Sequence, residues 1–393
     1  MRKLILLVFS ILGILPVCGQ QPISKVIDES LTFSAQQYKQ MAESLIDQPG
    51  RLPKTLDKNG KLVTCKSSWW VSGFFPGTLW YLFENSKDTE LKRMAETFTA
   101  RVEDQQFTTD NHDVGFMIYC SFGNGFRITG NPKYKDVICN AAKSLSTRFR
   151  ATTGCIRSWD WGKWQYPVII DNMMNLEMMF EASKLCDNKR FLDIAVSHAN
   201  TTMANHFRPD GSCFHVVSYD TITGKAVTHQ TRQGYADASS WARGQGWALY
   251  GYTMCYRETK DSKYLAHAQK VACFILNHPR LPKDKIPYWD FDDPAIPNTL
   301  RDASAGALIC SALIELSQYV DKKAGKKYLK VAEQQIRSLS SPVYRAKQGE
   351  NGNFILMHSV GSKPENSEVD VPLTYADYYF VEALMRYKKL FGR

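Results

Sequence analysis

The sequence predicts an all-α fold, an (α/α)6 toroid in which six helical hairpins close into a ring with a small β-hairpin in a loop at one end. Three observations support this fold class. Apolar residues recur at helical spacing along almost the whole chain. The helical segments come in pairs, and a polar turn joins the two members of each pair. The pairs follow one another at intervals longer than a common solenoid repeat, because each connection carries a long loop.

Six first helices and six second helices account for the ring. The first helices are expected at residues 73–85, 113–128, 171–185, 243–257, 302–319 and 375–390. The second helices are expected at residues 89–106, 134–149, 191–206, 264–276 and 328–339, with residues 27–45 closing the ring. First helices carry Gly, Ala, Ser and Met on several faces, as expected for an inner wall. Second helices carry Lys and Glu on one face, as expected for an outer wall.

The long connections lead to the end of the ring where the first helices begin. Residues 212–233, SCFHVVSYDTITGKAVTHQTRQ, alternate around a turn at residues 220–224, which predicts a β-hairpin at this end. Loops on a rigid scaffold commonly carry function. We therefore expect the functional site there.

The N-terminus reads MRKLILLVFSILGILPVCGQ and predicts a signal peptide over residues 1–19, which leaves residues 20–393 as a single domain. The apolar run is too short to span a membrane, so we expect no membrane span and an exported protein, periplasmic or secreted. Cys18 follows Leu15-Pro16-Val17, which loosely resembles a lipobox. Valine is a poor residue before such a cysteine, so a lipid anchor is the less favoured interpretation.

Composition limits the classes of partner. The net charge of +10 falls to about +8 once Arg2 and Lys3 are removed with the signal peptide. The basic residues are scattered and form no RNA motif, so we expect no nucleic-acid partner. A solvated basic surface and attraction to a polyanionic substrate both explain the charge.

The cysteines give no disulfide signal. Besides Cys18 there are nine, and no C-x-x-C pair occurs. Six of them stand singly within apolar helical patterns, at Cys120, Cys139, Cys186, Cys255, Cys273 and Cys310. We expect buried free thiols.

Polar residues converge where the first helices begin. Asp113 opens one first helix and Asp171 opens the next. An N-cap role explains one aspartate, but it does not explain two together with His112, Arg243 and several tryptophans. An arginine at a helix N-terminus is disfavoured by about 0.3–1 kcal/mol, which suggests that Arg243 holds an anion. Two carboxylates in one pocket suit acid–base chemistry, because their repulsion raises the pKa of one of the two, which can then stay protonated near neutral pH.

Four motifs, in this order and spacing, resemble glycoside hydrolase family 88, the unsaturated glucuronyl hydrolases. They are W-x-S-G-F-F-P-G at residues 70–77, HD-x-G-F at 112–116, D-N-M-M-N-L at 171–176 and Q-G-Y-A-D-x-S-x-W-A-R-G-Q at 233–245. The resemblance covers residues 27–393 and implies an (α/α)6 barrel. That fold agrees with the helix pairs counted above.

The resemblance implies an enzyme that removes the Δ4,5-unsaturated uronic acid from the non-reducing end of oligosaccharides cut by a lyase. Asp171 is then expected to donate a proton to C4, while water aided by Asp113 or Asp171 adds at C5. This is hydration of a vinyl ether, unlike the usual displacement at the anomeric carbon. We expect no cofactor and no metal, because the histidines lack zinc-site spacing.

The resemblance also implies substrate contacts. They are Trp70, His112, His215, Gln233, Trp241, Arg243 and Trp247. Arginine suits the substrate carboxylate, and tryptophan suits the flat unsaturated ring. The predicted hairpin adds His229, Thr231 and Arg232, although a lone histidine is more often structural.

The last long loop, HSVGSKPENS, adds Ser359, Ser362 and Lys363, which nearly match a sulfate-binding cluster of some family members. An ordinary polar turn explains these residues equally well. Glycosaminoglycan fragments are the favoured substrate. The alternatives are a family 105-type hydrolase of pectin fragments and a non-catalytic carbohydrate-binding toroid.

Overall fold

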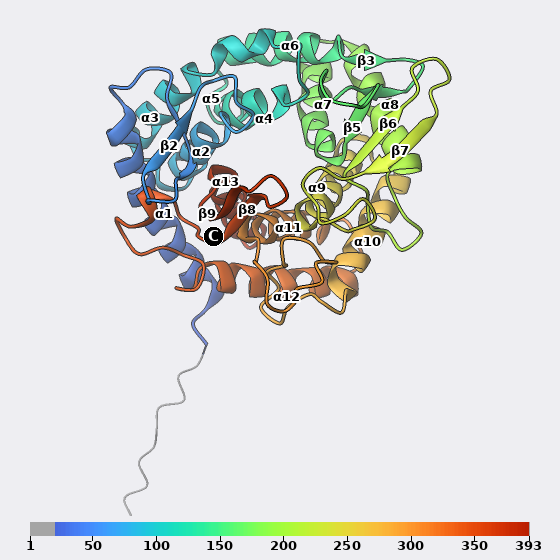
Figure 1. Ribbon diagram of the computed structural model, residues 1–393. Helices are drawn as coiled ribbons and strands as arrows, with labels where there is room; N and C mark the ends of the chain where they lie inside the picture. Colours follow the sequence, from blue (N-terminus) through green and yellow to red (C-terminus); the bar gives the residue numbers. More distant parts are fainter. Residues whose placement is uncertain (1–19, 393) are drawn as a thin grey trace, which may run out of the picture.

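Inner and outer helices form a closed ring in the computed structural model, which describes residues 20–392 (Figure 1). The inner wall consists of α2 (Phe74–Ser86), α4 (Val114–Ile118), α5 (Asn124–Thr129), α7 (Leu176–Leu185), α9 (Ala242–Thr259), α11 (Ala303–Leu316) and α13 (Thr374–Leu390). The outer wall consists of α1 (Ile23–Leu45), α3 (Thr89–Ala100), α6 (Pro132–Ser146), α8 (Lys189–Asn205), α10 (Ser262–Asn277) and α12 (Lys322–Leu339). The predicted all-α toroid is confirmed.

Two inner helices depart from plain α-helix. A π-helix, Tyr119–Gly123, joins α4 to α5 where one uninterrupted helix was expected. A 3-10 helix, Ile170–Asn175, precedes α7 and contains Asp171. A further 3-10 helix, Glu103–Phe107, follows α3. π-Helical segments are often found at functional sites.

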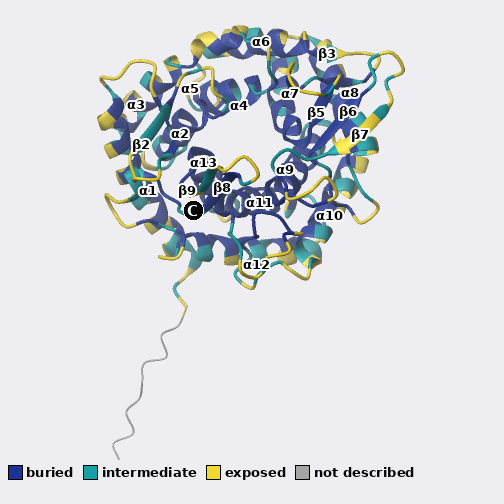
Figure 2. Cartoon of the chain, in the orientation of Figure 1, coloured by how far each residue is buried: buried dark blue, intermediate teal, exposed yellow. Residues whose placement is uncertain are grey.

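Burial separates the two walls, as the composition predicted. Every residue of α11 is buried, whereas α12 buries only one face (Figure 2). Close packing of the inner wall requires glycine at position 73, where an added Cβ would lie 2.2 Å from the Met117 carbonyl oxygen. Tyr38 of α1 donates its hydroxyl to Asp377 of α13 at 3.1 Å, so the two ends of the chain close the ring.

Short antiparallel sheets form in the connections between the helices. The expected hairpin is present as β6 (Val216–Tyr219) and β7 (Ala226–Gln230), and β5 (Pro167–Ile169) joins it as a third strand. Three more pairs were not predicted: β1 (Leu52–Leu56) with β2 (Leu62–Cys65), β3 (Phe149–Arg150) with β4 (Cys155–Ile156), and β8 (Ser359–Ser362) with β9 (Ser367–Val371). A 3-10 turn, Asn351–Asn353, precedes β8.

The prediction of free thiols was wrong for two cysteines. Cys139 of α6 forms a disulfide with Cys186 at the end of α7, with the Cα atoms 6.2 Å apart. The two residues are 47 positions apart, so only the packing of α6 against α7 brings them together. Among the other described cysteines, Cys273 is exposed and the rest are buried.

The predicted signal peptide and the lipid anchor at Cys18 lie outside the described residues. Within residues 20–392, no helix combines the length and the apolar character needed to cross a bilayer.

Candidate active site

A cavity of about 370 Å³ lies at the end of the ring where the inner helices begin. It contains most of the predicted site residues: Trp70, His112, Asp113, Asp171, His215, Arg232, Gln233, Arg243 and Ser362. The β1–β2 and β8–β9 hairpins also line the cavity, through Lys54 of β1 and Glu368 of β9. The convergence predicted from the helix pairs is therefore observed.

Asp113 and Asp171 start inner helices without capping them. Asp113 occupies the N-cap position of α4, and Asp171 lies in the first turn of the 3-10 helix; neither helix start has a side-chain capping hydrogen bond. Five outer helices, α3, α6, α8, α10 and α12, differ, because their N-cap side chains accept backbone N–H groups, as Asp321 does for α12. Among the inner helices, Asp302 caps α11 in the same way. The N-cap explanation therefore does not account for the two aspartates.

Both aspartates have a raised pKa. Burial raises the pKa of Asp171 to about 7, against the opposing effect of the Arg243 charge. Burial likewise raises the pKa of Asp113 to about 7, and Arg148 opposes it. The negative charge of Asp113 raises the pKa of Asp171 further, but it is a smaller cause than burial. Each carboxyl group is thus divided between its acid and its base form near neutral pH.

A buried histidine stands beside each aspartate. His112 Nε2 lies 3.4 Å from Asp113 Oδ1, and His215 Nε2 lies 3.6 Å from Asp171 Oδ2. Burial lowers the pKa of both imidazoles to about 3, with nearby arginines adding to the effect. Both rings are therefore neutral at physiological pH.

Arg243 is held inside the protein. Its guanidinium pairs with Asp302 at 3.0 Å and donates to the carbonyl oxygens of Val360 and Gly361 at 2.5 and 2.6 Å. These bonds connect the start of α9 to β8 and balance the cation at the helix N-terminus. The face of the guanidinium packs against Trp241, with its carbon 4.5 Å from the ring centre.

Unpartnered polar atoms mark this cavity. Among the described residues, six buried atoms of its lining have no hydrogen-bond partner: Trp159 Nε1, Asp171 Oδ2, His215 Nε2, Ser362 Oγ, Glu368 Oε1 and Tyr375 Oη. Of these, Glu368 Oε1 forms an ion pair with Lys54. Buried polar atoms almost always have partners in folded proteins. Their gathering around one cavity therefore indicates a polar ligand.

The family model for Glycosyl Hydrolase Family 88 matches residues 39–390. The chain belongs to glycosyl hydrolase family 88. It is therefore an enzyme, and the family predicted from the four motifs is confirmed.

Known members of family 88 are similar over most of the chain. An unsaturated glucuronyl hydrolase of Formosa agariphila is 51% identical over 82% of this chain and 80% of its own length. An unsaturated chondroitin disaccharide hydrolase of Streptococcus agalactiae is 33% identical over 81% of each chain. The crystal structure of an unsaturated glucuronyl hydrolase specific for heparin superposes with a TM-score of 0.92 at 48% identity, covering 94% of this chain and 99% of the other.

Several residues of this family 88 chain that were predicted as substrate contacts do not line the cavity. His229 turns away, because its Nε2 bonds to the Asn205 carbonyl oxygen at 3.0 Å. Lys363 pairs with Asp293 at 3.1 Å. Ser359, Trp241 and Trp247 are buried behind the cavity wall. Thr231 forms hydrogen bonds within the loop after β7, where its N–H donates to Asp237 and its hydroxyl accepts from the Gly234 N–H.

Other lining residues were missed by the predictions for this family 88 chain. Trp161 is 52% exposed and stacks on Trp159, with ring centres 5.0 Å apart. Arg232 lies 4.3 Å above the Trp161 ring and pairs with Glu365 at 2.6 Å. The tryptophans of the run SWDWGKW, residues 158–164, are close in the sequence, but their place at the cavity depends on how the loop before β5 folds.

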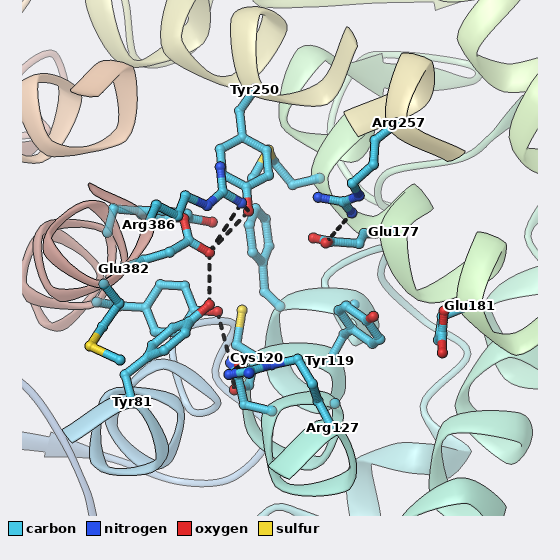
Figure 3. A pocket seen from close by; sticks show the side chains of 18 of the residues that line it. Tyr81, Tyr119, Cys120, Arg127, Glu177, Glu181, Tyr250, Arg257, Glu382 and Arg386 are labelled. Atoms are coloured by element: carbon cyan, nitrogen blue, oxygen red, sulfur yellow. Dashed lines mark hydrogen bonds and ion pairs between the residues drawn. The ribbon is translucent and has the colours of Figure 1, made fainter. Parts of the chain in front are cut away.

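A second cavity of about 390 Å³ lies between inner helices, and side chains of α2, α7, α9 and α13 line it (Figure 3). Its charged groups pair with one another: Arg257 bonds to Glu177 and Glu315, and Arg386 bonds to Glu315 at 2.7 Å. Glu382 accepts hydrogen bonds from two tyrosine hydroxyls at 3.0 Å each. Because its described polar groups satisfy one another, we place the active site of this family 88 enzyme in the first cavity.

Within the described residues, no group of three or more His, Cys, Asp or Glu side chains is arranged to hold a metal ion.

Proposed function

We propose that the chain removes the terminal Δ4,5-unsaturated uronic acid from lyase-generated glycosaminoglycan oligosaccharides. The observation that carries this proposal is the pair Asp113 and Asp171, two carboxyl groups with a pKa of about 7 in a cavity where several buried polar atoms lack hydrogen-bond partners. A carboxyl group that is partly protonated at neutral pH is suited to donate a proton.

In the proposed reaction Asp171 donates its proton to C4 of the C4=C5 double bond. A water molecule then adds through its oxygen at C5 and gives up a proton to a carboxylate, either Asp113 or Asp171. The resulting hemiketal at C5 opens, which breaks the bond to the ring oxygen. The ring oxygen takes up the hydroxyl proton, which leaves a hemiacetal at C1. This hemiacetal collapses to an aldehyde and expels the glycosidic oxygen as an alcohol, so the products are an open-chain keto acid and a shortened sugar.

The aromatic and charged lining supports a substrate with flat, acidic rings. At the cavity wall the ring centres of Trp70 and Tyr375 lie 4.9 Å apart, and the Trp161 side chain is exposed. Arg232 is the lining cation nearest to that face. The similar structure named for heparin makes unsaturated heparin disaccharides the first substrates to test.

The test follows the absorbance of the C4=C5 bond, which disappears when the bond is hydrated. We expect absorbance to fall with lyase-made heparin, chondroitin or hyaluronan disaccharides. Constant absorbance with all three would refute the proposal. A fall only with unsaturated rhamnogalacturonan fragments would favour the family 105-type activity, which the family 88 match does not favour.

We also propose that the protein is exported to the periplasm or secreted. The basic and apolar N-terminal residues support this location. The Cys139–Cys186 disulfide supports it too, because disulfides persist in oxidising compartments. Cell fractionation with an antibody tests it, and full-length protein found only in the cytoplasm would contradict it.

A further inference from the structure

The turn that carries Asp171 also carries two fully buried asparagines, Asn172 and Asn175. A buried amide must find partners for its oxygen and its nitrogen. The Asn172 oxygen has no hydrogen-bond partner among the described residues, whereas both ends of the Asn175 amide have partners, and these lead to the other aspartate.

Asn175 connects the two aspartate-bearing segments. Its Oδ1 accepts the backbone N–H of Phe116 at 3.0 Å, in the first turn after Asp113. Because an N–H group only donates, the atom facing it is the amide oxygen. The amide nitrogen therefore faces His112 Nδ1, at 3.2 Å. Gly115 permits this approach, since an added Cβ there would lie 2.5 Å from Asn175 Oδ1.

This bridge determines where His112 carries its proton. Its Nδ1 accepts from Asn175, so a neutral ring carries the hydrogen on Nε2. That nitrogen is the one 3.4 Å from Asp113 Oδ1. Asn172, in the same turn, donates its amide nitrogen to the Ile156 carbonyl oxygen at 2.9 Å, and its amide raises the pKa of His112 against the larger lowering by burial.

His215, beside Asp171, is held in the same tautomer, but by backbone N–H groups in place of a side chain. His215 Nδ1 accepts the N–H groups of Arg232 and Gln233 at 3.1 and 3.2 Å. Its Nε2 faces Asp171. Both aspartates thus face an Nε2–H group, but only the Asp113 side depends on a replaceable side chain.

We propose that Asn175 is a positioning residue for Asp113, holding His112 in the neutral Nε2–H tautomer that points at the Asp113 carboxylate. This inference deepens the proposed roles of the two aspartates. A donor opposite one carboxylate oxygen keeps the group oriented and favours its ionised form. Loss of that donor lets Asp113 turn and raises its pKa.

Kinetics of Asn175→Ala and Asn175→Asp across pH test the proposal. Alanine removes the donor at every pH, so we expect kcat to fall about 10–100-fold with little change in KM. An ionised aspartate presents an acceptor to His112 Nδ1, so the loss in Asn175→Asp should grow as pH rises and shrink where that carboxyl is protonated. Asn188→Ala is the control, since Asn188 caps α8 and should leave kcat and the pH profile unchanged.

A nitrogen-15 NMR spectrum of histidine-labelled protein reads the tautomer without substrate. We expect His112, assigned by the signal lost in His112→Gln, to carry its hydrogen on Nε2 in the parent and to change in Asn175→Asp. Parental kcat in folded Asn175→Ala would overturn the proposal. So would losses that track only the folded fraction, with an unchanged pH profile and tautomer. An inactive parent enzyme would instead refute the proposed function.

Discussion

At the scale of single residues, the environment of Asp113 and Asp171 sets their chemistry. Burial is the main cause of the raised pKa of both, and the arginines nearby prevent a larger rise. Trp247, buried behind the cavity wall, has a smaller effect, because its interaction with Asp171 lowers the pKa of that carboxyl group. The two groups thus remain able to exchange protons near pH 7.

We expect kcat/KM to fall as pH rises above about 7. The pKa of Asp171 is raised from 3.8 to about 7, so its acid form predominates below that pH and is lost above it. Only the acid form can protonate the substrate. Initial rates of absorbance loss between about pH 5 and pH 9 check this expectation, and a rate that still increases above pH 8 would contradict it.

At the scale of elements, the β8–β9 hairpin closes one side of the cavity through two ion pairs. Glu365, in the turn between the strands, pairs with Arg232 at 2.6 Å, and Glu368 of β9 pairs with Lys54 of β1 at 3.0 Å. Arg232 is therefore already engaged when an anionic substrate arrives. A substrate sulfate near Trp161 would have to compete with Glu365.

Glu365→Gln should lower KM for sulfated disaccharides by about 1.5–5-fold and leave kcat unchanged, because an exposed ion pair contributes about 0.2–1 kcal/mol. Unsulfated disaccharides should show no such gain. Glu350→Gln, which removes an exposed partner of Lys347, is the matched control. Equal gains with both substrate types would mean that Arg232 does not meet a sulfate.

At the scale of the whole molecule, helical periodicity was enough to predict the ring. Inner and outer helices bury different stripes, so their patterns are distinct in the sequence. The pairing of Cys139 with Cys186 was not predictable, because the two residues meet only once α6 packs on α7. The local β8–β9 hairpin was also missed, although only a short polar turn separates its strands. Alternation predicted the strand of His229, but not that its ring would turn toward Asn205 and away from the cavity.

The disulfide should stabilise the whole ring without affecting catalysis. Replacing Cys139 and Cys186 by serine should lower the free energy of unfolding by about 2–4 kcal/mol, because a closed loop restricts the unfolded chain. Urea unfolding measures the change. Cys273→Ser is the control, since that thiol is exposed and forms no disulfide in the described structure. Equal stability of the double variant and this control would contradict the expectation.

Activity of Asp171→Asn tests the central claim most directly. Asparagine keeps the shape of the side chain but has no acidic proton, and no capping bond is lost at the helix start. We predict an intact fold by circular dichroism, with kcat lower by about 10²–10⁴-fold on an unsaturated disaccharide. A folded Asp171→Asn protein with the parent's kcat would contradict the account.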